Sequence, residues 1–264
     1  MWPYIILVVF VCIASFKVCA QDYTAYKKES FIKDGDTLPY RLLMPLHYVP
    51  GVAYPVIFFL HGAGERGIDN NKQLVHGGKL FLKDSVRSQF PAIIVFPQCS
   101  EDSYWSNVLI KTDPATQKRT FHFSVNEPPT KAMQMLIALI DKIENEFTIK
   151  KEQVYVMGLS MGGMGTFELV KRKPNVFAAA VAICGGANPA TAAALTHTNW
   201  WVFHGAKDDV VTPDHSIEMV DALKKAGANT KFTLYPNANH NSWDAAFAEP
   251  GLLNWLFNNK KNSR

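Results

Sequence analysis

The sequence predicts a single α/β domain built on a mainly parallel sheet with helices on both faces. Strand-like and helix-like segments alternate from residue 55 to the end of the chain, which is typical of parallel sheets. Residues 55–60 and 92–97 are apolar throughout, which indicates strands buried on both faces. A length of 264 residues and a composition with 48% hydrophobic and 19% charged residues fit one globular domain.

The N-terminal edge of this sheet is expected to be antiparallel. Two strand-like runs, residues 27–33 and 38–44, flank the hairpin turn signal Asp34-Gly35-Asp36. The later elements are expected in this order: strand 55–60, a helix from about 74 to 84, strand 92–97, helix 130–147, strand 154–159, a helix that ends before Pro174, strand 177–183, strand 200–204, helix 213–227, strand 230–235 and helix 244–258.

Residues 99–127 are the least regular part of the chain, rich in Ser, Asp, Thr and aromatic residues. An excursion of this length within a compact domain is usually functional. Two interpretations stay open. The segment is either a surface flap, or a cap over a catalytic centre in which Tyr104 and Trp105 face the substrate.

The first twenty residues indicate an export signal. An apolar stretch, Ile5–Phe16, precedes Val18-Cys19-Ala20, so cleavage after Ala20 would leave residues 21–264 as the mature domain. As a helix the 12 apolar residues would rise only about 18 Å, short of a hydrocarbon core of roughly 30 Å. We therefore expect a secreted or periplasmic protein without stable membrane insertion, and favour this over a lipid anchor on Cys19.

Cys99 and Cys184 would remain after cleavage, each at the carboxyl end of an expected strand. Export permits a disulfide, but the two strands are separate and a large core needs no such bridge. Whether the two thiols pair stays open.

Charge and motif content exclude several function classes. The formal net charge of +4 is spread along the chain without a basic and aromatic stripe, which argues against nucleic-acid binding. No His/Cys cluster has metal-ligand spacing, and residues 158–165 lack the Lys-Ser/Thr ending of a phosphate loop. We expect neither a metal nor a cofactor.

The strongest local signal is Ser160, framed by Gly158 and Gly162 between a buried strand and an amphipathic helix. This is the Gly-x-Ser-x-Gly nucleophile elbow, a turn too tight for side chains at the two glycines. The pattern predicts a nucleophilic serine exposed at the tip of the turn. A plain glycine-rich turn between strand and helix is the alternative.

A serine nucleophile needs a base and an acid that orients the base. In the last loop after a strand, His240 is the candidate base, with a loop histidine that only caps the following helix as the alternative. Asp208 is the favoured acid, and its neighbour Asp209 is the rival. Ser160, Asp208 and His240 follow the chain order expected for such a fold, at strand ends that share one edge of the sheet.

The tetrahedral intermediate would need two N–H donors. Met161, at the start of the helix after Ser160, is expected to supply one, and Ala63 in the glycine-rich loop the other, with Gly64 as the alternative. His61 is expected to hold that loop. Glu65 and its neighbour Arg66 are expected to pair and brace it.

Five motifs together resemble the α/β-hydrolases, and more narrowly the secreted bacterial feruloyl and acetyl esterases of carbohydrate esterase family one and their dienelactone-hydrolase-like or predicted-peptidase relatives. The motifs are His61–Gly67, Pro97–Cys99 with Trp105, Gly158–Gly163, His204–Asp208 and His240–Asp244. The resemblance spans about residues 38–257, and it implies Ser160, Asp208 and His240 as a triad, in agreement with the motif order.

These features predict a secreted serine carboxylesterase of the feruloyl or acetyl esterase type, acting on small esters or esters of plant polysaccharides. Trp105 and Trp243 are expected to form an aromatic wall for the substrate, with packing as the alternative role. A small serine peptidase and a non-catalytic glycan-binding module of the same fold are the competing hypotheses.

Overall fold

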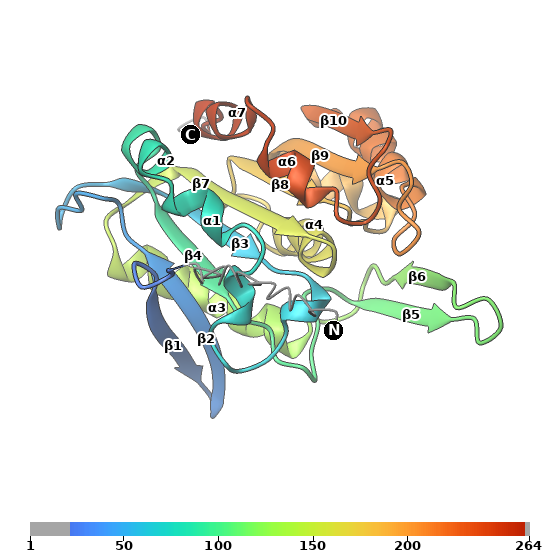
Figure 1. Ribbon diagram of the computed structural model, residues 1–264, viewed down its shortest axis with the longest axis horizontal. Helices are drawn as coiled ribbons and strands as arrows, with labels where there is room; N and C mark the ends of the chain where they lie inside the picture. The colour runs from blue at the N-terminus through green and yellow to red at the C-terminus, as the bar shows by residue number, and fades with distance from the viewer. Residues whose placement is uncertain (1–21, 262–264) are drawn as a thin grey trace, which may run out of the picture.

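The computed structural model describes residues 22–261, which fold into a central sheet between two layers of helices (Figure 1). The expected signal peptide, residues 1–20, lies outside the described residues, so export stays a prediction. No helix within the described residues has both the length and the apolar character needed to cross a membrane.

The sheet has eight strands, two of them antiparallel at one edge. They are β1 (Lys27–Lys33), β2 (Asp36–Leu43), β3 (Tyr54–Leu60), β4 (Ile93–Pro97), β7 (Ile149–Leu159), β8 (Ala179–Ile183), β9 (Asn199–Gly205) and β10 (Thr230–Tyr235). The spatial order is β1-β2-β4-β3-β7-β8-β9-β10. β1 and β2 pair antiparallel with each other, β2 also pairs antiparallel with β4, and the other neighbours are parallel. The predicted fold class is therefore confirmed.

Both faces of the central strands are buried, as their apolar sequences indicate. In β3, Val56, Phe58 and Leu60 belong to the core on one face, whereas Ile57 and Phe59 belong to the core on the other. This period of two assigns alternate side chains to opposite helix layers.

Helices cover the two faces in separate groups. They are α1 (Gly78–Leu82), α2 (Asp84–Gln89), α3 (Lys131–Glu146), α4 (Met161–Arg172), α5 (Asp214–Lys225), α6 (Trp243–Phe247) and α7 (Leu252–Asn258). Apolar residues of α3, α4 and α5 pack on one face, and those of α1, α6 and α7 on the other.

Two predicted helices differ from the structure. The expected helix 244–258 is divided into α6 and α7 around Pro250 and Gly251, because proline supplies no N–H for a helical hydrogen bond. The expected helix 74–84 is a short 3₁₀ turn, Lys72–Leu74, followed by α1. Gly77 separates them with a positive φ of 87°.

Residues 99–127 contain a second, two-stranded sheet that the sequence pattern did not predict. Strands β5 (Val108–Thr112) and β6 (Arg119–Phe123) form an antiparallel hairpin that projects beyond the central sheet (Figure 1). The inward side chains Val108, Ile110, Phe121 and Phe123 pack with Met164 and Val211. The segment is thus an ordered excursion fixed to the body by one face.

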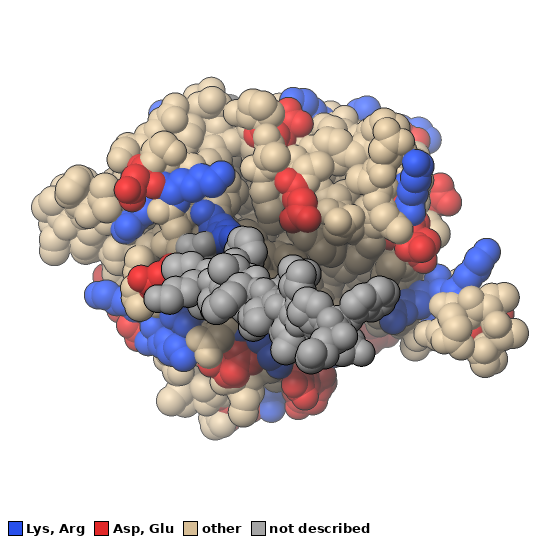
Figure 2. Space-filling view, viewed as in Figure 1, with Lys and Arg blue, Asp and Glu red and all other residues tan. Residues whose placement is uncertain are grey.

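Charged side chains are interspersed over the face of the molecule that Figure 2 shows, in agreement with a net charge spread along the chain. The hairpin between residues 108 and 123 is locally positive, with Lys111, Lys118 and Arg119 against the single acidic residue Asp113.

Candidate active site

Ser160 lies at the tip of a tight turn between β7 and α4. Its backbone has φ 52° and ψ −116°, a conformation that a non-glycine residue rarely adopts. A Cβ on Gly158 would lie 2.2 Å from the Gly162 carbonyl oxygen, and a Cβ on Gly162 would lie 1.9 Å from the Leu60 carbonyl oxygen. Only glycine fits at these two positions, so the elbow holds a strained serine with its side chain directed outward.

A hydrogen-bonded chain links the three residues that the motifs singled out. Ser160 Oγ lies 3.0 Å from His240 Nε2, and His240 Nδ1 lies 2.7 Å from Asp208 Oδ2. With Nδ1 donating to the carboxylate, Nε2 is left to accept the serine proton. Parallel pairing of Tyr235 with Gly205 brings the loops after β9 and β10 side by side, which places Asp208 next to His240.

Asp208 is buried and all of its lone-pair directions are used. Oδ1 accepts the backbone N–H groups of Val210 and Val211, both at 2.9 Å. Burial raises the pKa of Asp208, but the hydrogen bonds from His204, His240 and Val211 outweigh it and hold the pKa well below its usual value. The rival acid, Asp209, is exposed, and its carboxylate takes no part in the hydrogen bonds that link Ser160, His240 and Asp208.

A second histidine, His204, also contacts Asp208, and the sequence motifs did not predict this contact. His204 is fully buried, and its Nε2 lies 3.1 Å from Asp208 Oδ2 and 2.8 Å from the Val211 carbonyl oxygen. Its Nδ1 lies 2.7 Å from Ser216 Oγ. The carboxylate is therefore fixed between two imidazoles, and the spacing of His204 and Asp208 at a strand end was the available signal.

The loop after β3 lies against the elbow because Leu60 pairs with Gly158. Ala63 and Gly64 both line the space in front of Ser160, so the choice of oxyanion donor between them stays a prediction. Met161 is the first residue of α4, and within residues 22–261 its N–H donates to no protein acceptor outside the helix. An N–H free at a helix start is a favourable anion donor.

The brace of this loop differs from the expected pair of Glu65 and Arg66. Arg66 instead donates to the carbonyl oxygens of Ala63, Glu101 and Ser103. Glu65 lies on the cavity wall, with its Oε1 3.7 Å from His76 Nε2. Arg66 therefore braces the loop through backbone acceptors, which its fork of N–H donors matches.

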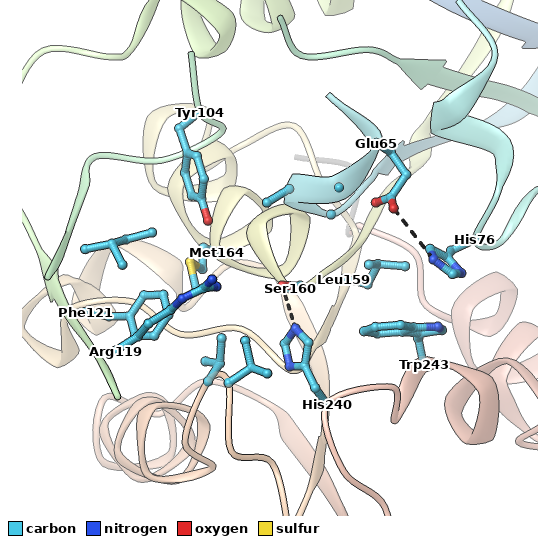
Figure 3. Close-up of a pocket in the computed structure, with 16 residues that line it drawn as sticks. Glu65, His76, Tyr104, Arg119, Phe121, Leu159, Ser160, Met164, His240 and Trp243 are labelled. Carbon is cyan, nitrogen blue, oxygen red and sulfur yellow. Dashed lines mark hydrogen bonds and ion pairs between the residues drawn. The ribbon is translucent and has the colours of Figure 1, made fainter. Parts of the chain in front are cut away.

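A cavity of about 230 Å³ opens in front of Ser160 (Figure 3). Its wall comes from the loop after β3, the hairpin segment, α4 and the loops of Asp208 and His240. The lining residues are Gly62, Ala63, Gly64, Glu65, His76, Tyr104, Ile110, Arg119, Phe121, Leu159, Ser160, Met164, Val210, Val211, His240 and Trp243.

The two predicted wall tryptophans have different positions. Trp243 lines the cavity and meets the His240 ring edge-on, with the centroids 5.4 Å apart. The expectation that Trp105 faces the substrate is wrong, because Trp105 is fully buried and does not line the cavity. Trp105 packs against His61, and a Cβ added to Gly165 would lie 2.4 Å from the Trp105 Cβ. Its neighbour Tyr104 faces the cavity instead.

Cys184 lies under the site, and its Sγ is within 4.8 Å of ligand atoms of Asp208 and His240. Burial raises the pKa of its thiol well above the usual value, which disfavours the thiolate that metals bind. Cys99 and Cys184 are both free and buried. The group is therefore poorly suited to hold a metal ion.

Replacing Gly162 with alanine is expected to disrupt the elbow. The new methyl group would meet the Leu60 carbonyl oxygen at 1.9 Å, and backbone on both sides must shift. We expect destabilisation of about 3 kcal/mol or more, measured by urea unfolding. Gly64→Ala is the matched control, because no atom lies within 4 Å of its new Cβ. Equal stability of the two variants would contradict the steric argument.

His61 is expected to make folding sensitive to acid. Its Nε2 accepts the Cys99 N–H at 2.9 Å and its Nδ1 donates to the Gly62 carbonyl oxygen at 2.7 Å. Burial lowers its pKa from 6.5 to about 4. Above pH 6.5 the ring is neutral in both states. As the pH falls towards 4 only the unfolded chain takes up the proton, so about 3 kcal/mol of stability is lost.

Unfolding free energies of the wild type and His61→Gln at pH 7 and pH 4 test this effect. Glutamine can accept the Cys99 N–H but cannot titrate. Between pH 7 and pH 4 the His61→Gln variant should therefore lose about 3 kcal/mol less stability than the wild type. An equal acid-induced loss in both proteins would assign the effect to other groups.

Comparison with known proteins identifies the family of this chain. Residues 51–249 match the family described as phospholipase/carboxylesterase. The chain belongs to this family. All of the predicted catalytic and oxyanion residues lie within the matched region.

Solved structures and a curated relative give the same picture. A thermostable esterase is 30% identical with a TM-score of 0.78, and the match covers 90% of this chain and 64% of that chain. A ferulic acid esterase of Anaeromyces mucronatus, in complex with ferulic acid, is 16% identical with a TM-score of 0.63, covers 91% and 93% of the two chains, and shows the fold alone. The bifunctional acetylxylan esterase/xylanase of Neocallimastix patriciarum is 36% identical over 118 residues, or 41% of this chain and 17% of that protein. The predicted resemblance to α/β-hydrolase esterases is confirmed.

Proposed function

We propose that this protein hydrolyses carboxylic esters through an acyl-enzyme on Ser160. The observation that carries the proposal is the Ser160 Oγ to His240 Nε2 hydrogen bond of 3.0 Å, at the tip of an elbow that opens into a cavity. His240 takes the hydroxyl proton as Ser160 attacks the ester carbonyl. Asp208 holds the imidazole in the tautomer that can accept this proton.

The oxyanion of the tetrahedral intermediate would be held by the N–H groups of Met161 and Ala63. Such donors are already oriented and cost no reorganisation during the reaction. His240 then gives its proton to the leaving alkoxide. A water molecule, activated by His240, releases the acid and restores Ser160.

The substrate class we propose is a small or aromatic ester of the feruloyl or acetyl type, including esters linked to plant polysaccharides. The cavity of about 230 Å³ is smaller than the roughly 300–1,000 Å³ of pockets for drug-sized ligands. Tyr104, Phe121 and Trp243 give it aromatic walls. Similarity to a thermostable esterase and to part of a bifunctional acetylxylan esterase/xylanase supports this choice.

The experiment is a substrate panel combined with covalent labelling. Purified protein is given 4-nitrophenyl acetate, methyl ferulate and a dipeptide amide, and Ser160 is probed with a fluorophosphonate followed by peptide mass spectrometry. We expect turnover of the esters and a single label on the Ser160 peptide, with Asp208→Asn labelled far more slowly.

Cleavage of the amide alone would favour a peptidase and overturn the ester proposal. Neither turnover nor labelling would favour a non-catalytic module.

A further inference from the structure

Arg119 differs from the other arginines of residues 22–261 in having no protein partner. Arg41, Arg66, Arg87 and Arg172 each donate hydrogen bonds to carbonyl, amide or carboxylate oxygens. Within that part of the chain, no carboxylate lies within 4.0 Å of Arg119. A guanidinium with five free donors is therefore available to a ligand.

The hairpin register places Arg119 on the cavity side. Arg119 pairs with Thr112, and Phe121 with Ile110, so these side chains share one face of the hairpin. Ile110, Arg119 and Phe121 all line the cavity. Figure 3 shows the Arg119 side chain running beside Phe121, with its guanidinium directed towards Met164 and the interior of the site.

Tyr104 provides a second donor in the same half of the cavity. Its hydroxyl points into the cavity (Figure 3), and within the described residues it makes no hydrogen bond to protein. Burial raises the pKa of Tyr104 to about 12, so the hydroxyl keeps its proton at neutral pH. Ile110, Phe121 and Met164 line the cavity beside these donors, and Arg119 itself is open to solvent, so a ligand can reach its guanidinium.

The opposite half of the cavity holds an acidic side chain beside a histidine. There Glu65 and His76 lie 3.7 Å apart beside Trp243, across Ser160 from Arg119 in Figure 3. The Glu65 carboxylate lies beyond ion-pair distance of Arg119, so within residues 22–261 no carboxylate compensates the Arg119 charge. An anionic group on a bound substrate would be attracted to the Arg119 side.

We propose that Arg119 and the Tyr104 hydroxyl form a carboxylate-binding subsite, and that the preferred ester carries a carboxylate in addition to its scissile bond. This proposal rests on the proposed ester hydrolysis and names its substrate class. The planar guanidinium matches the two oxygens of a carboxylate, and the tyrosine O–H group is a further hydrogen-bond donor. The carboxylate belongs to the acid or the alcohol part of the ester.

The kinetic test compares charged and neutral esters of similar shape, with acid release followed in a pH-stat. Monoethyl adipate against ethyl hexanoate tests the acid part, and 4-acetoxybutanoate against butyl acetate tests the alcohol part. In one of the two pairs, Arg119→Gln should lower kcat/KM about tenfold for the anionic ester, equivalent to about 1.4 kcal/mol. For its neutral partner the change should stay within about twofold.

Three further variants separate binding from general charge effects. Arg119→Lys should keep part of the preference, because it keeps the charge but not the fork. Tyr104→Phe should lose a smaller part. Lys111→Gln is the matched control, since Lys111 is an exposed cation of the same hairpin on its other face. Equal effects of Lys111→Gln and Arg119→Gln, or equal losses for charged and neutral esters, would overturn the subsite.

A binding measurement keeps the subsite testable without turnover. In a Ser160→Ala background, calorimetry with monoethyl adipate and 4-acetoxybutanoate should show about tenfold weaker binding of one ligand when Arg119 is also changed to Gln. Unchanged binding of both ligands overturns the subsite. If the wild type hydrolyses none of the four esters and neither 4-nitrophenyl acetate nor methyl ferulate, the proposed function fails separately. The binding comparison still tests the subsite in that case.

Discussion

Ser160→Ala is expected to lower kcat for ester hydrolysis about 10⁶-fold, because the hydroxyl that forms the acyl-enzyme is lost. The remaining loop donors can still polarise a carbonyl for attack by water, so a small residual rate above the uncatalysed reaction should persist. Substrate binding should change little, since the hydroxyl is small and the cavity wall is intact. Initial rates with 4-nitrophenyl acetate and burst-phase kinetics measure the effect.

Ser30→Ala is the control, because Ser30 is exposed on β1, far along the sheet from the elbow strand β7. Circular dichroism and thermal unfolding should be the same for both variants and the wild type. Turnover that survives in Ser160→Ala at more than a few per cent of the wild-type rate would show that another group is the nucleophile.

Asp208→Asn is expected to lower kcat about 10⁴-fold with little change in KM. One carboxylate oxygen faces two imidazole N–H groups, and the other faces the N–H groups of Val210 and Val211. An amide must direct its NH₂ at one of these donor pairs. If it faces His240, the imidazole changes tautomer, and Nε2 can no longer accept the proton from Ser160.

Asp209→Asn serves as the matched control for this change. It removes the same charge one residue away, but the side chain is exposed and outside the hydrogen-bonded chain. Its kcat should stay within about twofold of the wild type. Similar losses in the two variants would mean that net charge, and not the orientation of His240, explains the effect.

Much of this arrangement follows from short-range sequence signals. Apolar runs such as 55–60 identify buried strands, and their alternation with helices fixes the direction of the sheet. Once the strands are parallel, their carboxyl ends share one edge, so Ser160, Asp208 and His240 had to come together. Their hydrogen-bond distances, however, depend on pairings such as Tyr235 with Gly205 that no local pattern specifies.

The parts that were missed depend on contacts distant in sequence. Strands β5 and β6 bury only one face on a small cluster and leave Leu109 56% exposed, so their apolar period is weak. The burial of Trp105 depends on Gly165, sixty residues later, which leaves room for the indole. Residue type alone could not separate this packing role from the substrate wall that Tyr104 provides.

The hairpin that carries Arg119 joins the rest of the backbone at a single narrow base. The backbone enters and leaves it at Asn107 and Ser124, whose peptide groups are joined by a 3.0 Å hydrogen bond. No strand of the central sheet pairs with β5 or β6. We therefore expect that hairpins of other length or charge, grafted between these two residues, change selectivity and leave the proposed machinery of bond cleavage in place.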